Sequence, residues 1–164
     1  FNKSFLFEDP YVLAVPKNIS LENIKNLDDL KKSKESRVLN NIIQFEFGNQ
    51  HKKRIEDWFT SVLPDSRVFA KTRTYEVALS MVQSGRGVAI VPALAARLGG
   101  KKIDFDVNLY KTNLPQRKII SLIPSQYVRI EPYKSFIDSL VATGKNMQLP
   151  KANPVPPILE SLSI

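Results

Sequence analysis

The sequence predicts an α/β lobe of three layers, in which a mostly parallel sheet is covered by helices. Two observations lead to this fold class. The middle of the chain, residues 38–98, alternates three times between a short apolar run and an amphipathic helical pattern, which is typical of parallel sheets with helical crossovers. The run at residues 88–91 is apolar on both faces, as buried strands of parallel sheets are.

Each element follows from a local pattern. Apolar runs bounded by proline, glycine or charged residues predict strands, and apolar residues spaced three and four apart predict helices. The predicted strands are residues 11–16, 38–47, 67–72, 88–91, 103–110 and 117–123, and the predicted helices are residues 20–30, 49–63, 74–83, 92–98 and 132–144. Ser20 is a suitable N-cap for the first helix, and Gly85 is placed to end the third in a left-handed conformation. Residues 145–164 hold four prolines and little charge, so we expect an extended or partly disordered tail.

Composition excludes several classes of chemistry. The 164 residues include no cysteine and only one histidine, His51, which excludes disulfides, thiolate zinc sites, cysteine nucleophiles and multi-histidine metal sites. No apolar run has the ~18 residues that a membrane span needs. No nucleophile and base are brought together by any motif, so we expect neither an enzyme nor a bound cofactor. The net charge of +8 is compatible with an anionic ligand, with nucleic acid or with a solvated basic surface.

In open α/β sheets, ligands bind beyond the carboxyl ends of the strands, where helix N-termini offer free backbone N–H groups. This rule selects three turns, at residues 47–50, 72–75 and 91–93. Gly48 lets the backbone approach a ligand closely, Asn49 can cap the helix that follows, and Arg73 offers a forked donor for a carboxylate. The alternative is that these are ordinary helix caps and one surface arginine.

Residues 74–97, which read TYEVALSMVQSGRGVAIVPALAAR, resemble the effector-binding domain of LysR-type transcriptional regulators. Residues 7–16 resemble the first hinge strand of that family, and residues 119–124 the returning hinge strand. The resemblance spans about residues 5–143. It implies a Rossmann-like lobe of the type 2 periplasmic-binding-protein fold, in which two lobes enclose a small effector and most of the first lobe is missing. Lys17 and Asn18 stand where the family often has His-Pro.

The resemblance also implies a division of the chain. Residues 1–16 would form a hinge strand, 17–118 the second lobe, 119–144 the returning hinge strand and the last helix of the first lobe, and 145–164 a proline-rich tail. By position, the ligand-binding residues would be Phe45, Phe47, Gly48, Asn49, Arg73, Thr74, Tyr75, Val91 and Pro92. The interface with a partner subunit would be formed by Ile55, Trp58 and Phe59.

The function implied is effector sensing in a cytoplasmic bacterial regulator that forms a homo-oligomer, a dimer or tetramer. The partners would be a small anionic metabolite and, through a winged helix-turn-helix preceding Phe1, DNA; no membrane is involved. The alternative is a lobe of a periplasmic solute-binding protein of a transporter, which shares the fold and differs in location. An enzyme on the same architecture would need a nucleophile or base in the cleft.

Overall fold

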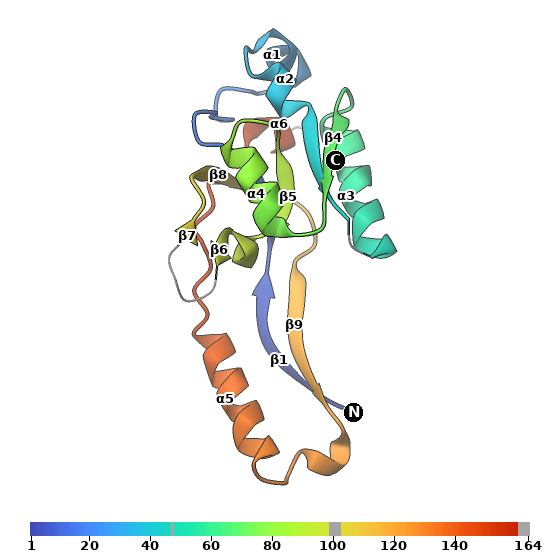
Figure 1. Ribbon diagram of the computed structural model, residues 1–164, viewed down its shortest axis with the longest axis vertical. Helices are drawn as coiled ribbons and strands as arrows, with labels where there is room; N and C mark the ends of the chain where they lie inside the picture. The colour runs from blue at the N-terminus through green and yellow to red at the C-terminus, as the bar shows by residue number, and fades with distance from the viewer. Residues whose placement is uncertain (47, 99–102, 161–164) are drawn as a thin grey trace.

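The molecule has a wide part and a narrow part (Figure 1), and the computed structural model describes residues 1–46, 48–98 and 103–160. We call the narrow part the stem. It consists of β1 (Asn2–Asp9), β9 (Arg117–Ile123) and α5 (Tyr133–Lys145). β1 and β9 are antiparallel, and α5 lies along β1. We call the wide part the lobe, and it holds the segments between β1 and β9 together with α6 (Pro157–Glu160).

The lobe is built on a mixed sheet. Its strands are β2 (Tyr11–Pro16), β3 (Asn41–Phe45), β4 (Arg67–Thr72), β5 (Ala89–Pro92) and β8 (Val107–Lys111), with β6 (Arg97–Leu98) and β7 (Ile103–Asp104) as a separate small pair. β3 and β4 are parallel, whereas β2 lies between β5 and β8 and is antiparallel to both. β2 enters the lobe from the stem and β8 leads back to it, which is why these two strands run in opposite directions.

A parallel bridge between Ile42 and Val88 joins the two halves of the sheet. The amide of Ile43 donates to the carbonyl of Val88 at 2.8 Å, and the amide of Val88 donates to the carbonyl of Asn41 at 2.9 Å. The neighbouring Gly87 makes this approach possible, because a Cβ there would lie 2.3 Å from the Asn41 carbonyl oxygen. The strand order across the bridge is therefore β4-β3-β5-β2-β8.

Helices cover both faces of this sheet, and every residue of β2 is buried. Tyr11, Leu13 and Val15 belong to the apolar cluster that contains the buried side of α3 (Asn49–Val62). Val12 and Ala14 alternate with them and belong to the cluster under α4 (Tyr75–Gln83). Because successive side chains of a strand point to opposite faces, α3 and α4 lie on opposite sides of the sheet. The predicted α/β fold of three layers is confirmed.

Several predicted elements have the expected bounds. β4 and β9 coincide with the strands predicted at residues 67–72 and 117–123. α4 begins after Thr74, whose hydroxyl accepts a hydrogen bond from the amide of Val77 at 3.3 Å. Gly85 has a φ of 72°, the left-handed conformation expected after a helix end.

The helix predicted at residues 20–30 begins later than expected, so the predicted start at Ser20 is wrong. Asn26 is the N-cap, and its side chain accepts from the amide of Asp29, so that α1 spans only Leu27–Lys32. Leu21 and Ile24 are still buried, in the turns before the helix. The strand predicted to begin at residue 38 begins at Asn41, because the preceding residues form α2 (Ser36–Leu39).

Three further expectations need correction. Pro92 is followed by a single 3-10 turn, η1 (Ala93–Ala96), and Arg97 belongs to a strand instead of continuing a helix to residue 98. Gly99 and Gly100, expected to end that helix, lie outside the described residues. The strand predicted at residues 103–110 is two strands, β7 and β8. The apolar run within residues 117–123 indicates a buried strand, but one face of β9 is open, with Ile120 and Leu122 43% and 55% exposed.

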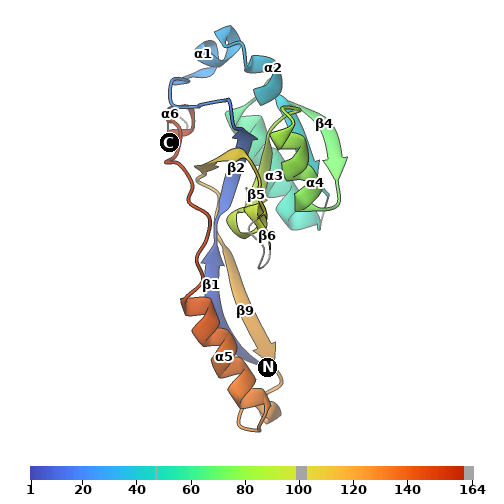
Figure 2. The same ribbon diagram turned by 60° about the vertical axis from the view of Figure 1, so that its left-hand side comes forward.

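The largest difference concerns the end of the chain. Residues 146–152 run from the stem back to the lobe without helix or turn after Asn146, as an extended tail does, but the segment then packs into the core. Figure 2 shows this return and the position of α6 below α1. Pro156 is fully buried, and Ile158 and Leu159 are 3% and 2% exposed within the cluster under α3. The disorder expected for this segment is therefore wrong for residues 146–160.

Replacement of Leu159 by alanine tests this packing. We expect the free energy of unfolding to fall by about 2–5 kcal/mol, because the substitution leaves a cavity in a closely packed core. Glu160→Ala, at the exposed neighbouring position, is the control and should change stability by less than about 0.5 kcal/mol. Urea unfolding of the two variants measures both values, and equal stabilities would contradict the buried position of Leu159.

Candidate functional site

The two crossings between stem and lobe meet at a buried ion pair. Asp9, the last residue of β1, is 0% exposed. One carboxylate oxygen accepts from the guanidinium of Arg117, the first residue of β9, and the other accepts from the amide of Leu94 in η1 at 3.0 Å. The guanidinium also lies 6.0 Å from the centre of the Tyr11 ring. These contacts hold β1 and β9 against the lobe.

A cavity of about 140 Å³ lies beside this ion pair. Its walls come from the hinge, from β3, from the exposed edge at β4 and from the first half of α3. The residues that line it are Tyr11, Ile42, Ile43, Gln44, Phe45, His51, Lys52, Ile55, Glu56, Phe59, Val68, Tyr75, Ile90 and Arg117. The interior is mainly apolar, and the polar groups are few, which is the usual composition of a small-molecule site.

Polar side chains around the cavity are hydrogen-bonded to one another. The Tyr11 hydroxyl lies 3.1 Å from Nδ1 of His51, and the amide nitrogen of Gln44 donates to Glu56 at 2.6 Å. The Nε of Arg117 is buried and has no hydrogen-bond partner among the described residues. An acceptor atom of a ligand at this place would satisfy that donor.

Aromatic rings form one wall of the cavity. Phe45 and Tyr75 are stacked, with ring centres 4.0 Å apart and planes inclined by 23°. Burial raises the pKa of the Tyr75 hydroxyl to about 12, and the neighbouring Tyr11 adds to this effect. Burial also raises the pKa of Tyr11, with Arg117 acting in the opposite direction. Both hydroxyls are therefore neutral hydrogen-bonding groups at physiological pH.

The turns selected from the sequence contribute unequally to this cavity. Phe45 and Tyr75 line it, and Phe47 lies outside the described residues. Gly48 precedes α3 with a φ of 58°, a conformation that favours glycine, and Gly48 itself occupies the cap position. Asn49 is the first residue of the helix and not its cap, so the capping role expected for it is wrong.

The remaining predicted ligand residues are not among the described residues that line the cavity. Arg73 is exposed between β4 and α4, and Thr74 caps α4. Val91 and Pro92 are fully buried in β5. A direct role for these four residues in ligand binding stays a prediction.

The three residues predicted at an interface lie on the side of α3 that faces the sheet. Trp58 and Phe59 are 6% and 3% exposed and belong to the core cluster. The indole nitrogen of Trp58 donates to the side-chain oxygen of Asn113 at 2.7 Å. Ile55 is partly buried and lines the cavity. Their contact with a partner subunit stays a prediction.

Sequence reasoning missed the hinge residues of the site and the polar side of α3. Tyr11 and Arg117 are 106 positions apart, and the pairing of Asp9 with Arg117 between β1 and β9 places Arg117 beside the start of β2. The position of His51 at the start of a predicted helix, beside Lys52 and Lys53, indicates an exposed polar residue, and His51 is exposed; only its contact with the Tyr11 hydroxyl at 3.1 Å had no sequence signal. Gln44 and Glu56 carried no motif. The available signal was position: Tyr11 begins the strand that follows Pro10, and Arg117 begins the returning strand.

Within the described residues, no group of three or more acidic or histidine side chains could hold a metal ion. No described helix is long and apolar enough to cross a membrane. The arrangement at the cavity offers hydrogen-bond donors, aromatic surface and a guanidinium, which suit binding.

The sequence comparisons agree with this interpretation. The family model for the LysR substrate binding domain matches residues 1–144. The chain therefore belongs to the LysR substrate binding domain family, whose members are effector-binding domains of LysR-type regulators, and this family favours the regulator over the transport receptor. A comparison with curated protein sequences finds no match.

Solved structures of regulatory domains share the fold. The regulatory domain of CcmR from Synechocystis PCC6803, in complex with 2-PG, aligns with a TM-score of 0.59 and 16% identity, over 94% of this chain and 69% of that chain. The reduced OxyR regulatory domain from Pseudomonas aeruginosa has a TM-score of 0.57 and 14% identity, over 89% and 66%. The effector binding domain of QuiR, in complex with shikimate, aligns with a TM-score of 0.55 and 19% identity, over 90% of this chain and 67% of that chain. This chain thus spans about two thirds of their length.

The raised pKa of Tyr75 gives a prediction for alkaline pH. The unfolded chain releases this proton near the ordinary value of 10, whereas the folded chain keeps it to about 12, so stability is lost as the pH rises through this interval. We expect Tyr75→Phe to remove that contribution. The free energy of unfolding of the variant should then fall less steeply than that of the parent between pH 10 and 12, with parallel profiles from pH 7 to 9. Parallel profiles throughout would contradict the raised pKa.

Proposed function

We propose that this chain is the effector-sensing part of a LysR-type transcriptional regulator, that it carries out no chemistry, and that it acts in the cytoplasm. The observation that carries the proposal is the cavity where the lobe meets the start of β9. A molecule bound there contacts Arg117 at the start of β9 and Tyr11 and Phe45 on the lobe. It can therefore favour one orientation of the lobe relative to the stem, provided that it binds that orientation more tightly.

The ligand we propose is a small anion with an apolar or ring-shaped body. The unpartnered Nε of Arg117 and the exposed guanidinium of Arg73 are donors suited to a carboxylate or phosphate. Lys52 also lines the cavity and adds positive charge. Its Nζ lies 3.9 Å from Oε1 of Glu56, which partly compensates that charge. The complexes of CcmR with 2-PG and of QuiR with shikimate make these two compounds suitable first probes.

The whole protein is proposed to contain a first lobe and a DNA-binding winged helix-turn-helix outside this chain. The stem supports the first lobe in this proposal, because it presents large apolar side chains to solvent. Phe5, Phe136 and Leu122 are 54%, 62% and 55% exposed. A first lobe of the same polypeptide packed on this face would bury them, and burial of such side chains is worth about 1.5–3 kcal/mol each.

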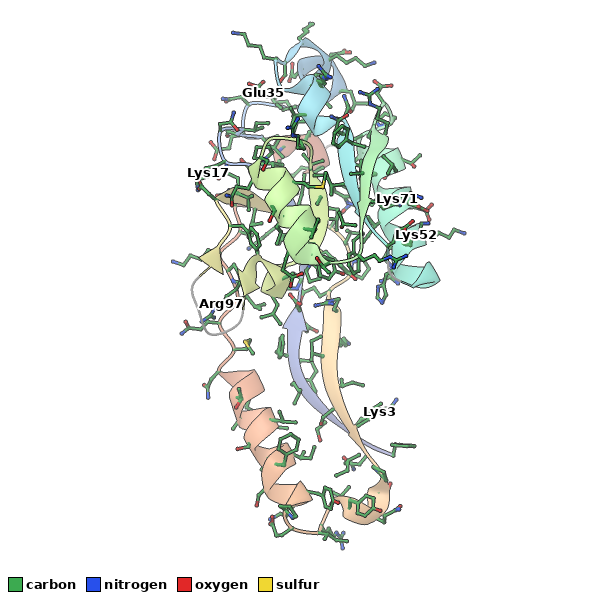
Figure 3. The ribbon with its side chains drawn as sticks, in the orientation of Figure 1. Lys3, Lys17, Glu35, Lys52, Lys71 and Arg97 are labelled. Atoms are coloured by element: carbon green, nitrogen blue, oxygen red, sulfur yellow. The ribbon has the colours of Figure 1, made fainter. Side chains whose placement is uncertain are left out.

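We also propose that the protein assembles through the β4 edge. β4 is the last strand of the sheet, and its Val68 and Phe69 are 47% and 48% exposed. Lys71 on the same strand pairs with Glu46 at 3.2 Å, and Figure 3 shows Lys71 and Lys52 on the same side of the lobe. An apolar sheet edge of this kind is suited to pairing with another subunit.

Arg73→Ala tests the predicted anion contact. We expect the affinity for the bound probe, 2-PG or shikimate, to fall about 10–100-fold, the usual loss when a charge-assisted hydrogen bond is removed. Isothermal titration calorimetry on the whole protein measures the change. Arg67→Ala is the control and should leave the affinity unchanged. Arg67 is an exposed arginine at the opposite end of β4, where it donates to Asn41. An unchanged affinity in Arg73→Ala would exclude Arg73 from the site.

Phe69→Asp tests the proposed assembly surface. We expect the variant to dissociate to a smaller species, because a charge in an apolar contact costs more than the contact provides. Val77→Asp, at a site 51% exposed on α4, is the matched control and should keep the parental mass. Sedimentation velocity separates the species, and identical masses for parent and Phe69→Asp would contradict assembly at β4.

A further inference from the structure

The segment after α5 forms a third connection between stem and lobe. β1 leads into β2 at Pro10, and β8 leads into β9 through residues 112–116. The chain then crosses a third time, from the end of α5 at Lys145 to Asn153 beside β8. Figures 1 and 2 both show this segment rising from α5 to α6 along the lobe. We call residues 146–152 the strap. It lies beyond residue 144, where the match to the family ends.

The strap is firmly anchored on the lobe. Asn153 extends the sheet edge at β8, where its amide donates to the carbonyl of Leu109 at 2.7 Å and its carbonyl accepts from the amide of Lys111 at 3.0 Å. Beyond it, Pro156, Ile158 and Leu159 are buried in the core. These side chains would have to leave the core before this end of the strap could move.

The strap is equally firmly anchored on the stem. Gly144, in the last turn of α5, lies against β1, and a Cβ at this position would be 2.7 Å from the carbonyl oxygen of Leu6. The backbone of α5 is therefore in direct contact with the backbone of β1 at this point. β1 and α5 move together because of this contact, and the strap begins two residues later.

Between these anchors, the stem and the lobe are separated by a groove of about 670 Å³. Leu94 and Arg97 line it on the lobe, and Ser139, Ala142 and Thr143 line it on α5. At its end, the guanidinium of Arg97 donates to the carbonyl of Gln148 in the strap; Figure 3 shows Arg97 on this side of the lobe, toward the stem. Rotation of the lobe about the hinge strands would change the width of this groove.

We propose that the strap is a tether of fixed length that limits rotation of the lobe away from the stem. The eight Cα–Cα steps from Lys145 to Asn153 cannot span more than about 29 Å even when fully extended. The groove can therefore narrow freely, but it can widen only until the strap is taut. Two crossings alone permit rotation in both directions, and the third crossing limits the rotation that widens the groove. This role does not depend on the identity of any effector.

A longer strap tests the tether while keeping both anchors. A Gly-Ser-Gly-Ser-Gly-Ser segment is inserted between Gln148 and Leu149 of the full chain, and spin labels are attached at Asp138→Cys on α5 and Glu76→Cys on α4. The chain has no cysteine of its own, so only these two positions are labelled. Electron–electron double resonance then measures the distance distribution between them. We expect its width roughly to double in the insertion variant, because the lobe is then held by two hinge crossings only.

The same insertion between Glu22 and Asn23, both exposed in a turn of the lobe, is the matched control and should leave the width unchanged. A strap insertion that does not widen the distribution, or widening of equal size in both variants, would overturn the proposal. Hydrogen exchange on the unmodified chain gives a second test that does not depend on folding of a variant. The amides of Asn153 and Lys111 should exchange as slowly as those of β2. Exchange at Asn153 as fast as in an exposed turn would also overturn the proposal.

Discussion

The carboxylate of Asp9 is the group on which the arrangement of stem and lobe depends. It is fully buried, and its charge is compensated by Arg117 from the other hinge strand and by the amide of Leu94 from η1. Removing one partner of a buried ion pair commonly costs about 3–5 kcal/mol, because the other charge is left without compensation. β1, β9 and η1, which are distant in sequence, therefore have to be in place together. Their arrangement positions Tyr11 and Arg117, which line the cavity.

The cavity has two kinds of wall, one formed by core residues of the sheet and α3 and the other by residues where stem and lobe meet. The sheet and α3 supply rigid apolar surface, since Phe59 and Ile90 belong to the core. The first residue of β9 supplies the guanidinium of Arg117 and the first residue of β2 supplies the hydroxyl of Tyr11, both at the place where stem and lobe meet. A site with this division can recognise the body of a ligand by shape and report its presence through the hinge. This combination suits a sensor better than a store or a catalyst.

Local chemistry explains which parts of the molecule could be predicted from sequence. The Thr74 hydroxyl caps α4, and Gly85 adopts a left-handed conformation after it because it has no Cβ. Phe45 ends a strand and Tyr75 follows one, and the patterns of both strands are clear. The cap at Asn26 and the single turn of η1 were missed, because competing local signals decide such short elements. Arg117 and His51 were missed for a different reason, since only tertiary pairing gives them their partners. The composition of the segment after α5 correctly indicates an extended chain for residues 147–152, but it does not reveal that Pro156 and Leu159 are buried in the core.

The close approach at Gly87 has a consequence for the sheet as a whole. The parallel pair β3 and β4 is joined to the three-stranded sheet β5-β2-β8 by the short parallel bridge between Ile42 and Val88, so a seam runs through the sheet at this place. The cavity lies across that seam, with Gln44 and Phe45 on one side and Tyr11 and Ile90 on the other. A molecule bound there would contact both halves of the sheet and hold them in register. The two halves can approach each other at this seam because Gly87 has no Cβ, which would lie 2.3 Å from the Asn41 carbonyl oxygen.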